Sequence, residues 1–307
     1  MIEREIRQKE RRGILVPMVM NFMQHCPIEI ETAEDIGRLT DLMMKTMIRE
    51  EERRDGKRYY SPSSLGEHCL RKSYLGRHAV INPDAPSPYG LMSHYYFFTG
   101  NFIHLKWQFA MYKLEKYIAN SSIFRVHDSE IPVASKHGDH RGTIDQIVFI
   151  YEEPYILDWK GLNVFSAKKI GLGKVPIQYR TQVGDYLVLW NSQRKLPFRI
   201  EKALLMVEDK GGGEKFLQEA LITLERDGKR ARRRLDKLRA HETTGMLPPP
   251  ACHSLKDKGF QDCQFKTICW PEVEAAGKEK TQRVREAMAK KEPTTAQRVA
   301  KVLKARR

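Results

Sequence analysis

Runs of apolar and β-branched residues divide the middle of the chain into short strands. Residues 142–150 form one such run, and residues 155–160 form a second one after a short turn that contains a proline. Residues 123–134 and 198–208 have the same character and lie before and after this pair. These segments predict a β-sheet in which the runs at 142–150 and 155–160 pair as a hairpin.

Apolar residues at helical spacing predict helices around these strands. Residues 100–117 form a long helix before the hairpin, and residues 178–191 form a helix after it. The glycine-containing stretch 161–177 is expected to be largely loop, and residues 209–214 are expected to turn into a basic helix. The order of these elements predicts an α/β fold with a central mixed β-sheet flanked by helices.

The two ends of the chain differ from this middle. Residues 1–57 are predicted to be helical and peripheral, with Thr32 as the N-cap of a helix that has an acidic first turn. The apolar stripe of that helix consists of Leu39, Leu42, Met43 and Met47. Residues 58–270 are predicted to form the main domain, and residues 271–307 a basic helical or disordered tail.

The charge balance favours a polyanionic partner. The chain has 54 Lys and Arg against 39 Asp and Glu, which gives a formal net charge of +15. The excess is concentrated in residues 226–239 and 278–307, and the second segment has 11 basic and 3 acidic residues. A solvated helix face and a disordered tail are the alternative explanation. Neither segment has a strong aromatic or leucine face, so nucleic acid is favoured over a membrane.

Nothing in the sequence predicts a membrane-spanning or exported protein. No apolar run approaches the roughly 18–20 residues that cross a bilayer. The charged N-terminus has no apolar stretch behind it like that of a secretory signal. We therefore expect a cytoplasmic location, in a bacterial, archaeal or phage-infected cell.

Two acidic residues and a lysine lie on the predicted hairpin. Asp145 lies in the first strand and Asp158 in the second, so pairing of the strands can bring the two carboxylates together. Lys160 follows Asp158 by two residues and therefore points to the same face. Two carboxylates and an ammonium can hold a hard divalent cation and position a water, which suits phosphodiester hydrolysis. A surface ion pair is the alternative.

Further polar residues lie on the predicted helices. His104 follows Gly100 by four residues in the helix before the hairpin. In the helix after it, Gln178, Gln182 and Tyr186 recur every four residues and share one face. The alternatives are a hydrogen-bonded core histidine and a tyrosine that packs between helices.

Taken in chain order, these residues resemble the RecB-like branch of the PD-(D/E)xK nuclease superfamily. The series is His104, Asp145, Asp158 with Lys160, and Gln182 with Tyr186. The resemblance covers roughly residues 61–270 and implies a restriction-endonuclease-like core.

The resemblance also implies roles for individual residues. Asp145 and Asp158 would bind Mg2+ or Mn2+, His104 would be a further ligand, and the backbone carbonyl of Trp159 would complete the set. An imidazole ligand favours Mn2+ somewhat over Mg2+. Lys160 would orient or activate the attacking water and stabilise charge on the phosphate.

Four of the five cysteines extend this resemblance. Some members of the branch, among them AddB-type and CRISPR-adaptation nucleases and their phage relatives, bind a 4Fe–4S cluster through one upstream and three downstream cysteines. Cys69 would be the upstream ligand here, and Cys252, Cys263 and Cys269 the downstream ones. Cys252 and Cys263 are separated by ten residues where the family usually has two, and zinc is the alternative metal. Cys26 is expected to be an ordinary buried thiol.

The expected function is that of a metal-dependent DNA nuclease, an exonuclease on single-stranded or linear ends. The resemblance implies that Gln182 and Tyr186 position DNA and the region of Lys160. Arg71 and Lys72 are expected either to contact phosphates or to form salt bridges. The alternative function is a non-catalytic DNA-binding or assembly module that acts with a recombination or replication protein. An RNA substrate stays open, because phosphate contacts carry no information about the sugar.

Overall fold

The computed structural model describes most of the chain between residues 13 and 269. The described residues are 13–26, 28–52, 58–78, 91–193, 197–212, 216–252, 254, 256–261, 263–266, 268–269 and 282. The expected tail at 271–307 and the proline-rich stretch at 82–88 therefore lie outside them, apart from residue 282.

A mixed β-sheet forms the centre of the described structure, as the sequence predicts. Its strands are β1 (Phe124–Ala134), β2 (Arg141–Ile150), β3 (Glu153–Leu162), β4 (Lys202–Asp209) and β5 (Leu217–Thr223). They lie side by side in this order, and every pair is antiparallel except β3 with β4, which is parallel. A parallel pair needs a crossover connection, and here helices fill it.

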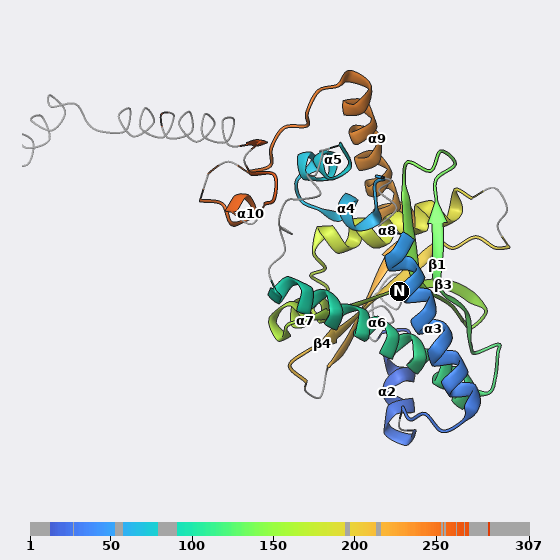
Figure 1. Ribbon diagram of the computed structural model, residues 1–307. Coiled ribbons are helices and arrows are strands. Elements are labelled where there is room, and N and C mark those ends of the chain that lie inside the picture. Colours follow the sequence, from blue (N-terminus) through green and yellow to red (C-terminus); the bar gives the residue numbers. More distant parts are fainter. Residues whose placement is uncertain are drawn as a thin grey trace, which may run out of the picture.

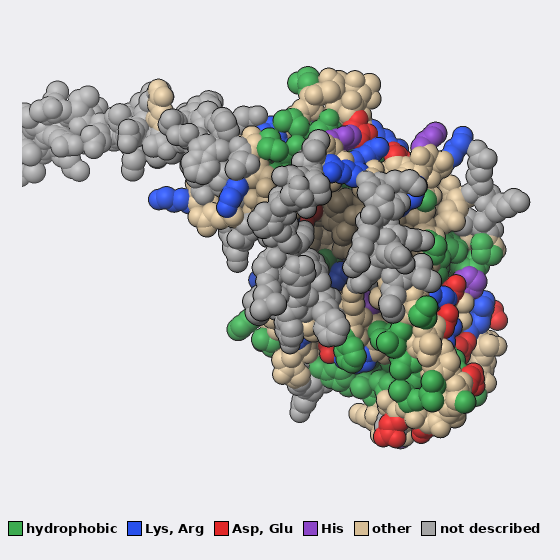
Figure 2. Space-filling view, in the orientation of Figure 1, with side chains coloured by type: hydrophobic (Ala, Val, Ile, Leu, Met, Phe, Trp, Pro, Cys, Tyr) green, Lys and Arg blue, Asp and Glu red, His purple; other side chains and the backbone are tan. Residues whose placement is uncertain are grey.

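Helices lie on both sides of this sheet. They are α2 (Val16–His25), α3 (Ala33–Glu52), α4 (Pro62–Gly66), α5 (Leu70–His78), α6 (Leu91–Ile118), α7 (Val164–Gly171), α8 (Ile177–Asn191), the π-helix η1 (Leu224–Gly228), α9 (Lys229–Thr244) and α10 (Lys258–Gln261). Figure 1 shows α2 and α3 at the bottom of the view and α4, α5 and α9 at the top. In Figure 2 the described surface is hollowed between these two groups. No helix in the described ranges has the length and apolar character needed to cross a membrane.

Helix α8 covers one face of the sheet as part of the β3–β4 crossover. Its Val183 and Leu187 are fully buried and belong to the same cluster as Ile156 on β3 and Leu205 on β4. Full burial of an aliphatic side chain of this size contributes about 1.5–3 kcal/mol. The crossover helix is therefore fixed firmly on the sheet.

Helix α6 covers the other face. Its Trp107 stacks on Trp159 of β3, with the ring centroids 5.1 Å apart and an interplanar angle of 5°. The indole of Trp107 also donates a hydrogen bond of 2.5 Å to Glu208 on β4. At Gly161 a side chain would collide with Ile103 of α6, so a glycine is needed for this close approach.

Helix α2 packs into the same core as α6. Val19 and Phe22 are buried in the cluster that contains Trp107 and Trp159. The expectation of a peripheral N-terminal region is therefore wrong for α2, because its apolar residues complete the core under the sheet.

Helix α3 agrees with its prediction in part. The backbone N–H of Asp35 donates to Thr32 Oγ1 over 3.1 Å, which confirms the N-cap. Of the expected stripe, Leu42 is fully buried and Leu39 half-buried, but Met43 is 47% exposed. The side chain of Met47 lies outside the described set.

A smaller third cluster joins segments that are distant in the sequence. Tyr60 and Leu65 lie next to α4, Leu238 lies on α9, and Phe265 comes from the C-terminal segment. These residues are buried together, and backbone bonds of Tyr60 with Asp139 and Arg141 join them to the start of β2. The cluster links the segment before the sheet to the segment after it.

Two expectations for the middle of the chain are wrong. Residues 161–177 are not largely loop, because α7 begins after Asn163, whose side chain accepts a hydrogen bond of 3.0 Å from the backbone of Ser166. The turn expected at 209–214 does not lead directly into the basic helix, because β5 comes first and pairs with β4 along seven residue pairs. The basic helix α9 then follows the π-helical turn η1.

Candidate active site

The candidate site lies where β2 and β3 part. Their last paired residues are Gln146 and Leu157, and the next residue on each strand is an aspartate. Asp145 is 3% exposed and Asp158 1% exposed. The carboxylate of Asp145 accepts a hydrogen bond of 2.9 Å from the backbone N–H of Trp159. The side chain of Asp145 thus takes the place of a strand neighbour at this point.

His104 approaches the first of these carboxylates from α6. Its Nδ1 lies 3.0 Å from Asp145 Oδ2. The stacking of Trp107 on Trp159 and the close approach at Gly161 keep this helix against β3. The predicted pairing of His104 with the acidic residues is therefore present in the geometry.

Lys160 and Gln182 approach the second carboxylate. Lys160 Nζ lies 2.9 Å from Asp158 Oδ2, and Gln182 Nε2 donates to Asp158 Oδ1 over 3.4 Å. Gln182 reaches the site from α8, so both helical layers of the fold contribute a side chain. The carboxylates, the ammonium, the imidazole and the amide predicted from the sequence all meet at one place.

The electrostatic environment separates the two carboxylates. Burial alone would raise the pKa of Asp145, but the neighbouring charges of His104 and Lys160 and the N–H of Trp159 outweigh it and set this pKa at about 2. Burial raises the pKa of Asp158 although Lys160 acts in the opposite direction. The charges of both aspartates outweigh burial at Lys160 and raise its pKa. The lysine is therefore cationic, and two close carboxylates favour a cation between them.

Sequence reasoning missed a third carboxylate, that of Glu130 on β1. Glu130 follows Ser129, which pairs with Gln146, so it lies opposite Asp145. Ligand atoms of His104, Glu130 and Asp145 all lie within 4.8 Å of one another. This set could hold a metal ion.

The backbone and a neighbour fix the position of Glu130. Its φ of +55° lies in the left-handed region, which is uncommon for a residue other than glycine and concentrates at functional sites. Gln108, buried on α6 one turn after His104, donates 2.7 Å to Glu130 Oε1 and 2.9 Å to the carbonyl of Asp145. No local pattern in the sequence pointed to this carboxylate.

The other two predicted residues of α8, Gln178 and Tyr186, lie one turn before and one turn after Gln182. Tyr186 is 8% exposed, and its Cε1 would lie 3.1 Å from a Cβ at Gly142 on β2. Gln178 is exposed, and its carbonyl packs against Gly66 of α4. Tyr179, which sequence reasoning did not select, lies close enough to contribute to the pKa of Lys160.

Four cysteines gather at a separate place. The pKa of Cys252 is raised by burial and then by charge on Cys69, Cys263 and Cys269, so all four thiols are electrostatic neighbours. The expected ligand set is thus brought together across the chain. Cys26 is half-buried and packs against the main core.

Two arginines lie beside this cysteine group. Arg71 is 3% exposed, donates through Nε to the carbonyl of Pro248, and has Nη1 3.8 Å from Cys269 Sγ. The half-buried Arg234 interacts with the charge of Cys69. The guanidinium of Arg71 is therefore buried and not available to phosphates. Its charge favours negatively charged sulfur nearby.

The spacing of the cysteines differs from that of a compact metal site. Among the described residues, no three thiol sulfurs lie within 4.8 Å of one another, whereas the histidine–carboxylate set does. Four sulfurs around one Zn2+ at about 2.3 Å each would be about 3.8 Å apart. The described sulfurs are therefore not arranged as four ligands around one Zn2+.

No family model and no curated protein matches this chain. Among solved structures, SSO0001 has 16% sequence identity and a TM-score of 0.40, covering 74% of this chain and 93% of that one. An alkaline exonuclease (LHK-Exo) from Laribacter hongkongensis has 11% identity and a TM-score of 0.38, covering 61% of this chain and 90% of that one. The LHK-Exo complex with dAMP has 10% identity and a TM-score of 0.37 over the same shares. At such values, the function must be inferred from the chain's own side chains.

Proposed function

We propose that this protein is a divalent-metal-dependent nuclease that hydrolyses phosphodiester bonds. One observation carries the proposal. Two ion pairs, His104 with Asp145 at 3.0 Å and Lys160 with Asp158 at 2.9 Å, lie side by side at the point where two central strands part. An ammonium beside two buried carboxylates combines a cation-binding site with a group that can stabilise a phosphate.

The donors fit a divalent cation such as Mg2+ or Mn2+. Asp145 and Asp158 offer hard oxygen ligands, Glu130 adds a third, and His104 offers the nitrogen that favours Mn2+ somewhat. The carbonyl of Trp159 is proposed as a further ligand. When bound, such an ion lowers the pKa of a bound water and polarises the phosphate.

The remaining side chains would act on water and substrate. Lys160 is cationic and held by Asp158, so it can orient a water by hydrogen bonding and stabilise negative charge that develops on the phosphate. Gln182 donates to the same carboxylate and would keep Asp158 turned toward the cation. We propose that Tyr186, one turn farther along α8, contacts the substrate.

DNA is the proposed substrate, attacked as a single strand or at linear ends. The net charge of +15 supports a polyanionic substrate. The second candidate is a non-catalytic DNA-binding or assembly module that works with a recombination or replication protein, and the same basic surface favours it. The two differ in whether metal-dependent cleavage occurs.

We also propose that Cys69, Cys252, Cys263 and Cys269 bind a 4Fe–4S cluster, with zinc as the alternative. The two neighbouring arginines support a negatively charged group at this place. The cluster would fasten the segment before the sheet to the segment after it, and its binding energy would contribute to folding.

The experiment is cleavage of end-labelled linear and closed circular nucleic acid, single- and double-stranded, DNA and RNA, with Mg2+ or Mn2+. Anaerobically purified protein is compared with Lys160→Ala and with Lys202→Ala. Lys202 is a matched control because, like Lys160, it pairs with a carboxylate. Its partner is Glu153 at 2.7 Å, at the end of β3 opposite to the candidate site.

A fall in cleavage of about 10²–10⁴-fold in Lys160→Ala, with activity retained in Lys202→Ala, is the expected result. Cleavage of linear substrates alone would identify an end-dependent exonuclease. Firm binding without metal-dependent cleavage would instead favour the non-catalytic module.

A further inference from the structure

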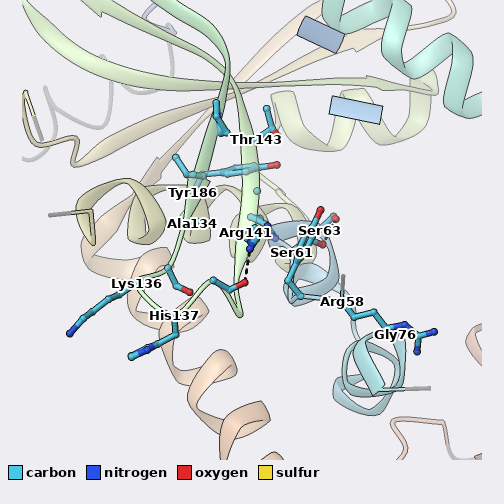
Figure 3. A pocket seen from close by; sticks show the side chains of 17 residues that line it. Arg58, Ser61, Ser63, Gly76, Ala134, Lys136, His137, Arg141, Thr143 and Tyr186 are labelled. Atoms are coloured by element: carbon cyan, nitrogen blue, oxygen red, sulfur yellow. Dashed lines mark hydrogen bonds between the residues drawn. The ribbon is translucent and has the colours of Figure 1, made fainter. Parts of the chain in front are cut away.

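A polar cavity of about 930 Å³ lies between the end of the β1–β2 hairpin and α4. Figure 3 shows Lys136 and His137 on the hairpin side and Ser61, Ser63 and Arg58 on the opposite side. The ring of Tyr186 projects into the space between them. The cavity thus has two walls and an aromatic floor.

Its lining is basic. Arg58, Lys136, His137 and Arg141 line it, and none of the residues around it is an aspartate or glutamate. None of these four side chains forms an ion pair with another described residue. The nearby carboxylate of Asp139 is already taken by Arg239 at 2.8 Å on α9. The positive charge of the walls is therefore not neutralised by their described neighbours.

Arg141 is held ready at the hairpin end. Its Nε donates 3.1 Å to the carbonyl of Gly138, and its guanidinium carbon lies 5.6 Å from the ring centre of Tyr59. This fixes the side chain while its outer N–H groups face the cavity that it lines. Arginine positioned in this way binds phosphate well.

The cavity lies next to the candidate active site along two elements. On β2, Thr143 lines the cavity and lies two residues before Asp145. On α8, Tyr186 lines the cavity one turn after Gln182, which contacts Asp158. The part of the cavity near Thr143 and Tyr186 therefore adjoins the two carboxylates.

We propose that this cavity is a groove that binds the sugar–phosphate backbone of one nucleic-acid strand and leads it to Asp145 and Asp158. This inference rests on the proposed nuclease function. Basic residues on both walls suit successive phosphates, and the half-buried ring of Tyr59 offers a face on which a base can stack. A single strand exposes its bases to such a ring, whereas a duplex keeps them paired.

The test measures equilibrium binding of a fluorescent single-stranded oligonucleotide by anisotropy, in a Lys160→Ala background that prevents cleavage. The groove variant carries Lys136→Ala and Arg141→Ala. The matched control carries Arg199→Ala and Lys202→Ala, which removes the same charge near the start of β4, at the opposite end of the sheet. Thermal unfolding of each variant checks the fold.

The groove variant should bind about tenfold more weakly. The slope of the logarithm of its binding constant against the logarithm of the salt concentration should become shallower by about 0.7 for each phosphate that the protein no longer neutralises. The control should bind like its parent. The single variant Lys136→Glu, at an exposed position that does not affect folding, should weaken binding in the same direction. Unchanged binding by the groove variant, or equal weakening in the control, would overturn the groove.

The binding assay separates this inference from the nuclease function. If the unmodified protein does not cleave but the groove variant alone binds more weakly, the groove is supported and the nuclease function is contradicted. If cleavage depends on Lys160 but the groove variants bind normally, the nuclease stands and the groove falls. A duplex that binds as tightly as the single strand, and is weakened equally by the groove variant, would overturn the assignment to one strand.

Discussion

The two candidate metal centres are built in opposite ways. The carboxylate site lies on the central sheet, between two large cores, and its neighbours Leu157 and Trp159 are fully buried. The cysteine site lies beside the small third cluster, and its outermost ligands, Cys69 and Cys269, are about 200 residues apart. The first site is shaped by the fold itself, whereas the second closes a long loop.

This contrast predicts at which site folding depends on the bound metal. Strand pairing and helix packing already position the carboxylates, so an ion there adds little to folding. Closing a loop of this length costs conformational entropy, and the third cluster beside the cysteines is smaller than the two cores on the sheet. Metal binding, which contributes about 10–16 kcal/mol in small structural zinc sites, is of the size needed. We therefore expect loss of the metal from the carboxylate site to abolish catalysis, and loss of the metal from the cysteine site to impair folding.

The largest effect should come from Asp145→Asn. The substitution removes a ligand charge, but the amide oxygen can still accept from the N–H of Trp159. Cleavage should fall about 10³-fold or more, while the melting temperature stays close to that of the unmodified protein. Activity assays and thermal unfolding check this together. Unchanged cleavage would remove Asp145 from the site.

Replacing a cysteine should have the contrasting result. Cys263→Ser should reduce the iron content and lower the melting temperature by about 5–10 °C, because the loop is no longer fastened. Cys26→Ser is the matched control, since Cys26 packs against the main core. Metal analysis and calorimetry of anaerobic protein measure both. A variant that keeps its metal and stability would contradict the proposed centre, and zinc in place of iron would select the alternative.

Glu130→Gln should have an intermediate effect. Removing this charge beside His104 and Asp145 should raise the metal concentration for half-maximal cleavage by about 10–100-fold. Titration of Mg2+ and Mn2+ provides the measurement. Glu201→Gln, at an exposed ion pair with Arg199, is the control. An identical titration curve would mean that Glu130 is not a ligand.

The smallest effect should come from Gln182→Ala. Its bond to Asp158 is long, at 3.4 Å, so we expect the cleavage rate to fall by about tenfold. Gln178→Ala, one turn earlier on α8 and exposed, should have no effect. Equal decreases in the two variants would show that this helix face matters only for packing.

The sequence was sufficient to predict those helices and strands whose own residues form a clear pattern. β2 and β3 are rich in apolar residues, and both are found within two residues of their predicted ends. The edge strand β5 was missed because it contains Gln, Glu and Ala, which disfavour strands unless a neighbour pairs with them. α7 was missed because glycines at 161, 171 and 173 outweighed the capping signal of Asn163.

Of the candidate site, Asp158 and Lys160 could be predicted from local sequence, and the family resemblance added His104, Asp145 and Gln182, but Glu130 could not be predicted. Asp158 and Lys160 share a face because they are two residues apart on a strand. Glu130 depends on the register of β1 against β2 and on a left-handed backbone, neither of which is written in local sequence. The gathering of Cys252 with Cys69 likewise depends on the packing of the third cluster.

The gap between β2 and β3 also supplies a probe of the site. The amide proton of Trp159 bonds to Asp145 rather than to a strand neighbour, so any cation that draws this carboxylate away must alter that proton. Its resonance and its rate of exchange with solvent would change on occupancy. The same residue stacks on Trp107, so intrinsic fluorescence would respond as well. Loading of the site could then be followed in real time without a substrate or a label.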